Sequence, residues 1–236
     1  MNIAIVGAGG HGRVVLDIIR AAGQHQAVSF LDSNPKLSGR RIDGVPVVGG
    51  CERLPDLRAQ GVTGVVVAIG DNGVRRGFAE QFRADGFELI NVLHPSAQIA
   101  STATLGCNVV IAAGVVVSAH CQIGDSAILN TGCIVDHESM IGTSAHICPG
   151  VRLAGHVTVE SGAFVGIGAT VVQNIRIGFD AVVGAGAVVI RDVDPMTTVV
   201  GVPAHEIKSA PSATEFATLL QPAWDPHDPE HLIGAR

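Results

Sequence analysis

The sequence predicts two folds in series, a small α/β domain with a parallel sheet followed by a parallel β-helix. Three observations lead to this prediction. Strand-like and helix-like segments alternate through the first 95 residues. From Ile99 onward, an aliphatic residue recurs at every sixth position for fifteen repeats. The chain also contains 30 glycines but only 3% aromatic residues, a composition that favours closely packed repetitive β structure over an ordinary mixed core.

Length and charge exclude several classes of protein. With 236 residues, the chain is long enough for one or two domains. Hydrophobic residues make up 47%, yet no uninterrupted apolar run approaches the roughly 20 residues that cross a bilayer. The start, MNIAIVGAGG, has no basic segment before its first strand-like run, so we expect no secretory signal and no membrane insertion. A net charge of -6 and a pI of about 5.9 provide no basic field for nucleic acid.

The first 95 residues read as alternating strands and helices. The stretch IAIVGAGGHGRVVLDIIRAAG predicts a strand, a glycine-rich turn and an amphipathic helix that ends near Gly23. After it we expect a strand ending at Asp32 (AVSFLDSNP), an edge strand (GVPVVGG), a strongly apolar strand (GVTGVVVAIGDN), a helix (VRRGFAEQFRADG) and a last strand (FELINVLH). This alternation predicts a small parallel sheet with nucleotide-sized crevices at the carboxyl ends of its strands.

The glycine-rich turn fits a phosphate-binding loop. Gly7, Gly9 and Gly12 satisfy the pattern G-x-G-x-x-G, and Asp32 lies twenty residues beyond Gly12. Phosphate oxygens would accept hydrogen bonds from the backbone N–H groups of GAGGHG. The unit ends near Asn91, before a second mononucleotide-binding half, so a dinucleotide has no place for its nicotinamide. A single nucleotide or nucleotide sugar is favoured over NAD(P) and over a purely structural turn, and all three interpretations stay open.

A six-residue period governs the chain after residue 98. Neither the helical period of 3.6 nor the strand period of 2 explains it. Six residues with one inward aliphatic side chain form one face of a triangular solenoid, so eighteen residues make a coil and the fifteen repeats make about five coils. The repeats begin at Ile99, Leu105, Ile111, Val117, Ile123, Leu129, Val135, Ile141, Ile147, Leu153, Val159, Val165, Val171, Ile177 and Val183.

Cysteines and histidines give no metal-binding pattern. The five cysteines contain no CxxC pair and are expected to be buried thiols of a reducing cytoplasm. His120 and His156 are two coils apart on one corner, about 10 Å, which is too far for two ligands that must each lie about 2 Å from a zinc ion. His137 and His146 fall at different positions of the coil. We therefore expect no metal. A metal shared between subunits stays an open alternative, for which the sequence shows no ligand signature.

Six motifs together resemble one enzyme family. They are IVGAGGHGRVVLD, FLD, AIGDN, HPSAQIA, ILNTGCIVDHESMIG and VVGVPAHEIK. In combination they resemble the hexapeptide-repeat sugar acetyltransferases, which include sialic acid O-acetyltransferases and the PglD-type and perosamine N-acetyltransferases. The resemblance extends from Asn2 to about Lys208. It implies a Rossmann-like nucleotide-sugar-binding domain over 1–95, a left-handed parallel β-helix acetyltransferase domain over 96–193, and a C-terminal segment and tail over 194–236.

The resemblance also implies a direct transfer from acetyl-CoA, without an acyl-enzyme. The acceptor amine must lose a proton, and histidine is the side chain that accepts one near neutral pH. His137 matches the family's general base, and Glu138 matches the carboxylate that orients its ring. Asn130 matches a residue that lines the acceptor sugar, and His146 matches a histidine close to the thioester. The neighbouring Asp136 receives no role from the resemblance.

Further positions are implied to bind the two substrates. Arg75 is also interpreted, equally well, as a solvated helix residue. The positions that match the backbone lining the pantetheine and adenine groove are Gly155, Gly166, Ile167 and Ala185. The positions that match the nucleotide site are Gly9, Gly10, His11 and Gly12 in the phosphate turn and Asp32 as a base or ribose contact. Asn72 and Arg75 are expected to bind the nucleotide because they lie at the end of the apolar strand.

These matches favour acetyl-CoA-dependent N-acetylation of a nucleotide-linked amino sugar, in the cytoplasm and for surface-glycan synthesis. O-acetylation of sialic acid or a related sugar is the alternative, because the same base serves a hydroxyl. A non-catalytic nucleotide-binding trimer and an NAD(P)-dependent enzyme are more distant alternatives. The resemblance implies a homotrimer with active sites between subunits. The residues after Lys208, including Trp224, run past the usual end of the family and are interpreted as a disordered tail or as a strap over a neighbouring subunit.

Overall fold

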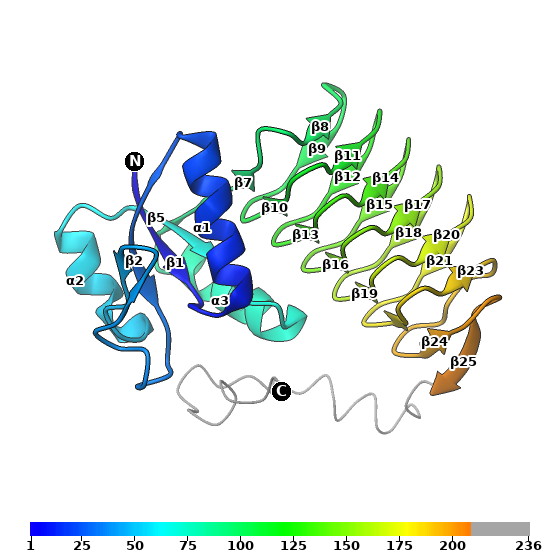
Figure 1. Cartoon of the computed structure of the whole chain (residues 1–236). Coiled ribbons are helices and arrows are strands. Elements are labelled where there is room, and N and C mark those ends of the chain that lie inside the picture. Colours follow the sequence, from blue (N-terminus) through cyan, green and yellow to red (C-terminus); the bar gives the residue numbers. More distant parts are fainter. Residues whose placement is uncertain (209–236) are drawn as a thin grey trace. The chain divides into compact units, whose positions relative to one another are not determined.

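The computed structural model describes residues 1–208, which divide into two compact units (Figure 1). The first unit spans Met1–Pro95, and the second begins at Ser96. Residues 209–236, for which a tail or a strap is predicted, lie outside the described residues.

The first unit is a parallel sheet with helices packed on both faces. In chain order its elements are β1 (Asn2–Val6), α1 (Gly10–Ala22), β2 (Gln26–Leu31), β3 (Arg41–Ile42), β4 (Val45–Pro46), a 3-10 turn (Cys51–Arg53), α2 (Leu54–Ala59), β5 (Gly64–Val67), α3 (Asn72–Ala84), β6 (Glu88–Leu89) and β7 (Val92–Leu93). The sheet order is β2-β1-β5-β6. Helices α2 and α3 share a buried cluster with Val6 and Val65, whereas Gly12 of α1 lies against Phe30 on the opposite face. Strands covered on both faces are apolar throughout, which explains the uninterrupted runs IAIV and GVVV.

Local signals account for most helix ends in this unit. Gly23 ends α1 in the left-handed conformation, at φ 66°, as predicted. The Asp71 carboxylate accepts the N–H of Val74 at 2.8 Å, so α3 begins at Asn72, earlier than the sequence predicted. The prediction of a single last strand was wrong, because β6 and β7 are separate. Helix α2 was not predicted, since its six residues are too few to show a helical period.

The second unit is a parallel β-solenoid with three faces (Figure 1). The first face consists of β8 (Gln98–Ile99), β11 (Val116–Val117), β14 (Ile134–Val135), β17 (Arg152–Leu153), β20 (Thr170–Val171) and β23 (Val188–Val189). The second face consists of β9 (Thr104–Leu105), β12 (Gln122–Ile123), β15 (Met140–Ile141), β18 (Thr158–Val159) and β21 (Arg176–Ile177). The third face includes β10 (Val110–Ile111), β13 (Ile128–Leu129), β16 (His146–Ile147), β19 (Phe164–Val165), β22 (Val182–Val183) and β24 (Thr198–Val200), followed by antiparallel β25 (His205–Lys208).

The register confirms the six-residue period. Each strand pairs in parallel with the strand one coil away, so Val117 lies opposite Val135 and Val135 opposite Leu153. The inward aliphatic side chains form the core, with both Val135 and Ile147 at 0% exposure. The first face has six strands and therefore six coils, one more than predicted, because the period continues through Val189.

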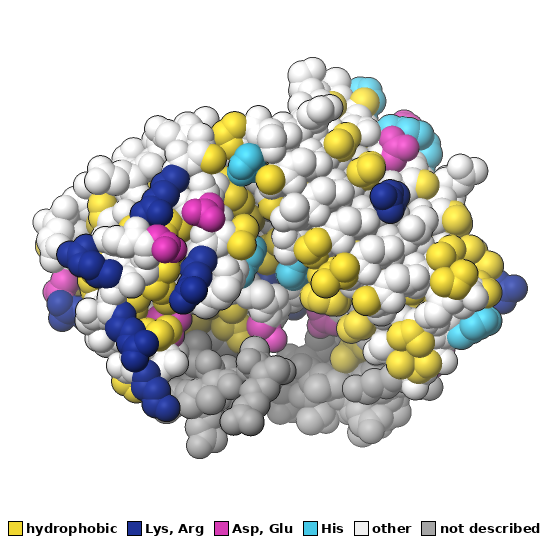
Figure 2. Space-filling view, viewed as in Figure 1, with side chains coloured by type: hydrophobic (Ala, Val, Ile, Leu, Met, Phe, Trp, Pro, Cys, Tyr) yellow, Lys and Arg dark blue, Asp and Glu magenta, His cyan; other side chains and the backbone are white. Residues whose placement is uncertain are grey.

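The two units differ in surface charge. Lys and Arg side chains gather on the first unit, whereas the solenoid surface seen in Figure 2 carries few of them. Asp and Glu side chains lie among the basic ones on the first unit. Across residues 1–208, no helix has both the length and the apolar character needed to span a bilayer.

Candidate active site

The glycines of the β1–α1 turn have different structural roles. Gly7 has a φ of 104°, which side-chain-bearing residues rarely adopt. A Cβ on Gly12 would collide with the carbonyl oxygen of Gly7, so Gly12 allows the helix to approach the strand. A Cβ on Gly9 or Gly10 would meet no atom within 4 Å. The first and last glycines are therefore required by the fold, and the exposed middle pair leaves backbone open to a ligand at the start of α1.

Asp32 lies beside this turn. Its Oδ2 accepts the N–H of Ala8 at 2.8 Å, and its Oδ1 accepts the N–H of Asn34 at 2.9 Å. The carboxylate therefore links the end of β2 to the glycine turn. This position agrees with the predicted nucleotide contact, which stays a prediction.

His11 follows the same turn, largely buried and within reach of the charge of Arg75. Burial, and secondarily the charge of Arg75, lower the pKa of His11 from 6.5 to about 4. The unfolded chain takes up this proton near pH 6.5 and the folded chain only near pH 4, so the contribution of His11 to stability is present above pH 6.5 and is lost as the pH falls through about 4.

Acid should therefore destabilise the wild-type protein more than a His11→Gln variant. From pH 7 to pH 4, we expect the wild type to lose up to about 3 kcal/mol more of unfolding free energy than the variant. Urea unfolding at several pH values, followed by circular dichroism, measures this difference. His120→Gln, at an exposed position, is the control; equal pH dependence in the wild type and the His11 variant would contradict the prediction.

The solvated-helix interpretation of Arg75 is wrong. Its side chain is 0% exposed, and Nη1 donates to the carbonyl oxygens of Ile69 at 2.9 Å, Gly70 at 3.1 Å and Asp71 at 3.3 Å. Nη2 donates to Oδ1 of Asn72 at 2.8 Å. Burial lowers the pKa of the guanidinium to about 9, which still leaves it charged at neutral pH. Arg75 thus holds the segment after β5 in place, and any contribution it makes to a nucleotide site is indirect.

The sequence triplet Asp136-His137-Glu138 forms the corner between the first and second faces, called the His137 corner below. Nδ1 of His137 lies 3.2 Å from Oε2 of Glu138, and both side chains are about half exposed, at 51% and 50%. The backbone N–H of His137 donates to Oδ1 of Asp136 at 2.8 Å. Asp136 therefore stabilises the turn, which gives this carboxylate a structural explanation that the sequence did not supply. Since a carboxylate only accepts hydrogen bonds, its contact makes Nδ1 the N–H of the neutral ring and Nε2 the basic nitrogen.

Gly155 lies one coil after His137 and makes room for its ring. A Cβ on Gly155 would lie 2.5 Å from both Cε1 and Nε2 of His137. The sequence assigned Gly155 to the coenzyme groove; in this chain it directly contacts the predicted base.

Replacing Gly155 with alanine should therefore displace the ring. We expect kcat for acetyl transfer to fall by about 10²-fold, the scale of an approximately 1 Å misplacement of a catalytic group. Stability should change little, because a half-exposed ring can swing into solvent. Steady-state kinetics and thermal unfolding of Gly155→Ala, beside a Gly73→Ala control in α3, measure both quantities. An unchanged kcat in Gly155→Ala would show that the ring does not need this space.

His156 was missed as a partner of the triplet. Its Nε2 lies 3.0 Å from Oε2 of Glu138, the same oxygen that His137 contacts. The rings of His137 and His156 also meet edge to face, with centroids 5.4 Å apart and an interplanar angle of 87°. A sequence signal existed, because Glu138 and His156 are one coil of eighteen residues apart. The structure places both at equivalent corner positions, each with a φ of 57°.

The remaining predicted residues lie at another edge of the solenoid. Asn130 occupies the corner between the third and first faces, and its Nδ2 lies 3.3 Å from Nε2 of His146 on β16. His146 is only 9% exposed and stacks edge to face on Phe164, with centroids 5.3 Å apart. If Asn130 donates, Nε2 of His146 is the acceptor and Nδ1 carries the proton. Gly166, Ile167 and Ala185 follow at the same corner in later coils, with Ile167 at 61% exposure.

One solenoid therefore divides the predicted site between two corners. His137, Glu138 and Gly155 lie before strands of the second face, whereas Asn130 and Gly166 lie after strands of the third face. A triangular cross-section keeps these corners on separate edges. The predicted catalytic pair and the predicted coenzyme groove therefore lie on different edges of one chain.

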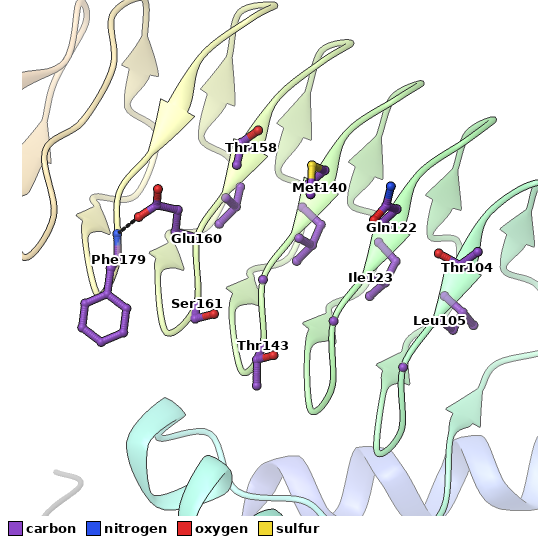
Figure 3. A pocket seen from close by; sticks show the side chains of 15 residues that line it. Thr104, Leu105, Gln122, Ile123, Met140, Thr143, Thr158, Glu160, Ser161 and Phe179 are labelled. Atoms are coloured by element: carbon purple, nitrogen blue, oxygen red, sulfur yellow. Dashed lines mark hydrogen bonds between the residues drawn. The ribbon is translucent and has the colours of Figure 1, made fainter. Parts of the chain in front are cut away.

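A groove on the second face lies outside the predicted site (Figure 3). It has a volume of about 590 Å³, and Thr104, Gln122, Met140 and Thr158 line it from successive coils. At one end, Glu160 accepts the N–H of Phe179 at 2.7 Å. The groove is lined by the strands of this face and by residues that follow them, such as Gly106 and Ser161, whereas the His137 corner precedes the strands. None of the three residues of the triplet lines the groove.

Known proteins share both units of this fold. The sequence model of the PglD N-terminal domain matches residues 2–82. GDP-perosamine N-acetyltransferase from Caulobacter crescentus, solved as a histidine-to-alanine mutant with CoA and GDP-perosamine, is 42% identical and has a TM-score of 0.85, covering 89% of this chain and 98% of that one. The chain belongs to the hexapeptide-repeat sugar acetyltransferases. The match confirms the predicted family, and the solenoid is the left-handed β-helix of these acetyltransferases.

Two further relatives of the chain are also acetyltransferases. The acetyltransferase domain of PglB from Neisseria gonorrhoeae, solved with acetyl coenzyme A, is 34% identical and has a TM-score of 0.83, covering 87% of this chain and 98% of that one. UDP-N-acetylbacillosamine N-acetyltransferase of Bacillus subtilis is 36% identical over 117 residues. That match spans 48% of this chain and 51% of the relative, about half of the curated protein's length.

Proposed function

We propose that this acetyltransferase moves the acetyl group of acetyl-CoA to the amine of a nucleotide-linked amino sugar, with His137 as general base, in surface-glycan biosynthesis. The observation that supports this most directly is the contact between Nδ1 of His137 and Oε2 of Glu138, at 3.2 Å. It leaves Nε2 with the lone pair that a general base needs. Relatives that act on nucleotide-linked amino sugars, and that bind CoA or acetyl-CoA, support the choice of substrates.

The reaction is a direct acyl transfer. The neutral sugar amine attacks the thioester carbonyl and forms a tetrahedral intermediate whose oxygen carries negative charge. Nε2 of His137 takes one proton from the attacking nitrogen, the C–S bond breaks, and the thiolate of CoA leaves and takes up that proton, which returns His137 to its neutral form. Glu138 keeps the ring in the required tautomer and stabilises the imidazolium that forms.

Two copies of the chain are proposed to complete each site. The His137 corner of one subunit meets the Asn130 corner of the next, in a homotrimer. His146 lies close to the thioester, and backbone at Gly166, Ile167 and Ala185 lines the coenzyme. The separation of these groups on different edges of one solenoid supports this arrangement, since a single chain leaves them apart.

The first unit is proposed to hold the nucleotide. Phosphate groups bind the exposed backbone of Gly9 and Gly10 at the start of α1, beside His11. Asp32 contacts the ribose or the base. Gly12 and Arg75 act indirectly, because one allows the helix to pack closely and the other anchors the segment after β5.

Release of CoA thiol tests the proposal. The assay uses acetyl-CoA with GDP-, UDP- and dTDP-linked amino sugars, and compares each with the sugar that carries hydroxyl in place of amine, and with free sialic acid. Thiol release with an amino sugar, together with an acetamido product by mass spectrometry, is expected. Acetylation of free sialic acid alone would identify an O-acetyltransferase instead, and no release with any acceptor would favour a non-catalytic nucleotide-binding protein.

Metal removal should leave this activity unchanged. The ligand-type atoms of His137, Glu138 and His156 lie within 4.8 Å of one another, so a metal requirement can be tested directly. General-base transfer to a thioester uses no metal, and we expect the same kcat before and after treatment with EDTA and dialysis. Activity that disappears with EDTA and returns with Zn²⁺ would contradict the proposed mechanism.

A further inference from the structure

His156 and Glu138 occupy equivalent positions in successive coils. Both residues take the left-handed conformation at the His137 corner, each with a φ of 57°. The backbone N–H of His156 also donates to the carbonyl oxygen of His137 at 2.9 Å. Because neighbouring coils lie about 4.8 Å apart, two side chains at equivalent positions leave the corner side by side. The backbone of the solenoid therefore places His156 beside Glu138.

One carboxylate oxygen receives both histidines. Oε2 of Glu138 lies 3.2 Å from Nδ1 of His137 and 3.0 Å from Nε2 of His156. A carboxylate has no proton to give, so each of these ring nitrogens must carry N–H. The basic Nε2 of His137 is thereby left unprotonated. Nε2–H of His156 donates a hydrogen bond to Glu138.

Because the Glu138 side chain is exposed to solvent, its contact with His156 restricts a side chain that would otherwise rotate freely. The side chains of Glu138 and His156 are 50% and 51% exposed. A single exposed ion pair contributes little, because the long side chain of glutamate stays free to rotate. A second donor, from the next coil, restricts that rotation to the orientation that contacts His137. The edge-to-face contact of the two rings, 5.4 Å between centroids, restricts His137 on the same side.

We propose that His156 is a positioning residue for acetyl transfer, which donates Nε2–H to Glu138 and so keeps that carboxylate on Nδ1 of His137. This inference rests on the proposed function, in which His137 is the base. His156 itself touches neither substrate in this role. Its loss should therefore lower kcat, with KM for acetyl-CoA and for the acceptor unchanged.

A double-mutant cycle tests the proposal with the full-length enzyme. We expect His156→Ala to lower kcat by about tenfold in the wild-type background and to have no further effect in Glu138→Ala, because the two changes remove the same support. His156→Gln, which retains an N–H donor of similar reach, should recover most of the loss. Equal losses in both backgrounds, an unchanged kcat, or a change confined to KM would each overturn the proposal.

Two controls separate this inference from the proposed function. His120 occupies the same corner position one coil before Glu138, and within residues 1–208 it makes no ion pair with that carboxylate. His120→Ala should therefore leave kcat unchanged. His137→Ala is measured alongside: activity that survives this change refutes the proposed base, whereas an inactive His137→Ala beside a fully active His156→Ala refutes only the role of His156.

Discussion

Replacing His137 with alanine is expected to lower kcat by about two to four powers of ten, the usual contribution of general-base catalysis. The expectation depends on the geometry of the corner. Glu138 contacts Nδ1 at 3.2 Å, and Gly155 leaves space for the opposite side of the ring. Alanine removes the proton acceptor while the coil backbone, which pairs through neighbouring strands, stays intact. Steady-state CoA release at saturating acetyl-CoA and acceptor measures the effect.

The matched variants for this prediction are His137→Asn and Glu138→Gln. Asparagine keeps a polar group in place but cannot accept the proton at neutral pH, so its kcat should resemble that of alanine. Glu138→Gln keeps the shape of the carboxylate and loses its charge, so we expect a smaller loss than in His137→Ala. Because His137 is half exposed, all three variants should unfold at nearly the wild-type temperature. Comparable kcat values for His137→Ala and the wild type would refute the assignment of His137 as the general base.

The solenoid was readable from the sequence because its determinants repeat. Each sixth residue points inward, so the period itself identifies the core, as at Val135 and Leu153. The same spacing of one coil, applied to the corner residues, also identifies the neighbours of His137 and Glu138. Adding one coil to His137 gives Gly155, and adding one coil to Glu138 gives His156. What the period leaves open is the direction of each exposed side chain, which decides whether equivalent positions actually meet.

The first unit was less predictable, since its site depends on contacts between distant segments. The Asp32 carboxylate accepts a hydrogen bond from the N–H of Ala8, and no local sequence pattern predicts this contact. Arg75 did carry a signal: with Phe78, Ala79 and Phe82 it follows the spacing i, i+3, i+4, i+7, which marks the buried stripe of an amphipathic helix. An arginine on that stripe indicates a buried cation. Only the structure shows that carbonyl oxygens after β5 receive it.

Truncation of Arg75 is expected to destabilise the first unit by about 3–5 kcal/mol, because buried carbonyl groups lose a donor and the removed side chain leaves a cavity. Arg75→Lys retains the charge but not the planar fork that reaches Ile69, Gly70 and Asn72 together, so it should restore only part of this stability. Glu80→Ala, at an exposed position of α3, is the control and should change stability little.

Circular dichroism at 222 nm during urea unfolding resolves this effect, because the helices of residues 1–208 all belong to the first unit. The Arg75→Ala transition should move to lower urea in the helical signal, while kcat at low temperature and saturating substrate stays measurable. A nucleotide that binds the folded unit should raise the urea midpoints of the wild type and of Arg75→Ala by similar amounts, since binding to the folded state alone stabilises both proteins equally when their affinities are equal. A direct nucleotide contact by the guanidinium predicts a different pattern, in which Arg75→Ala weakens nucleotide binding at unchanged stability. The complete burial of the side chain favours the loss of stability.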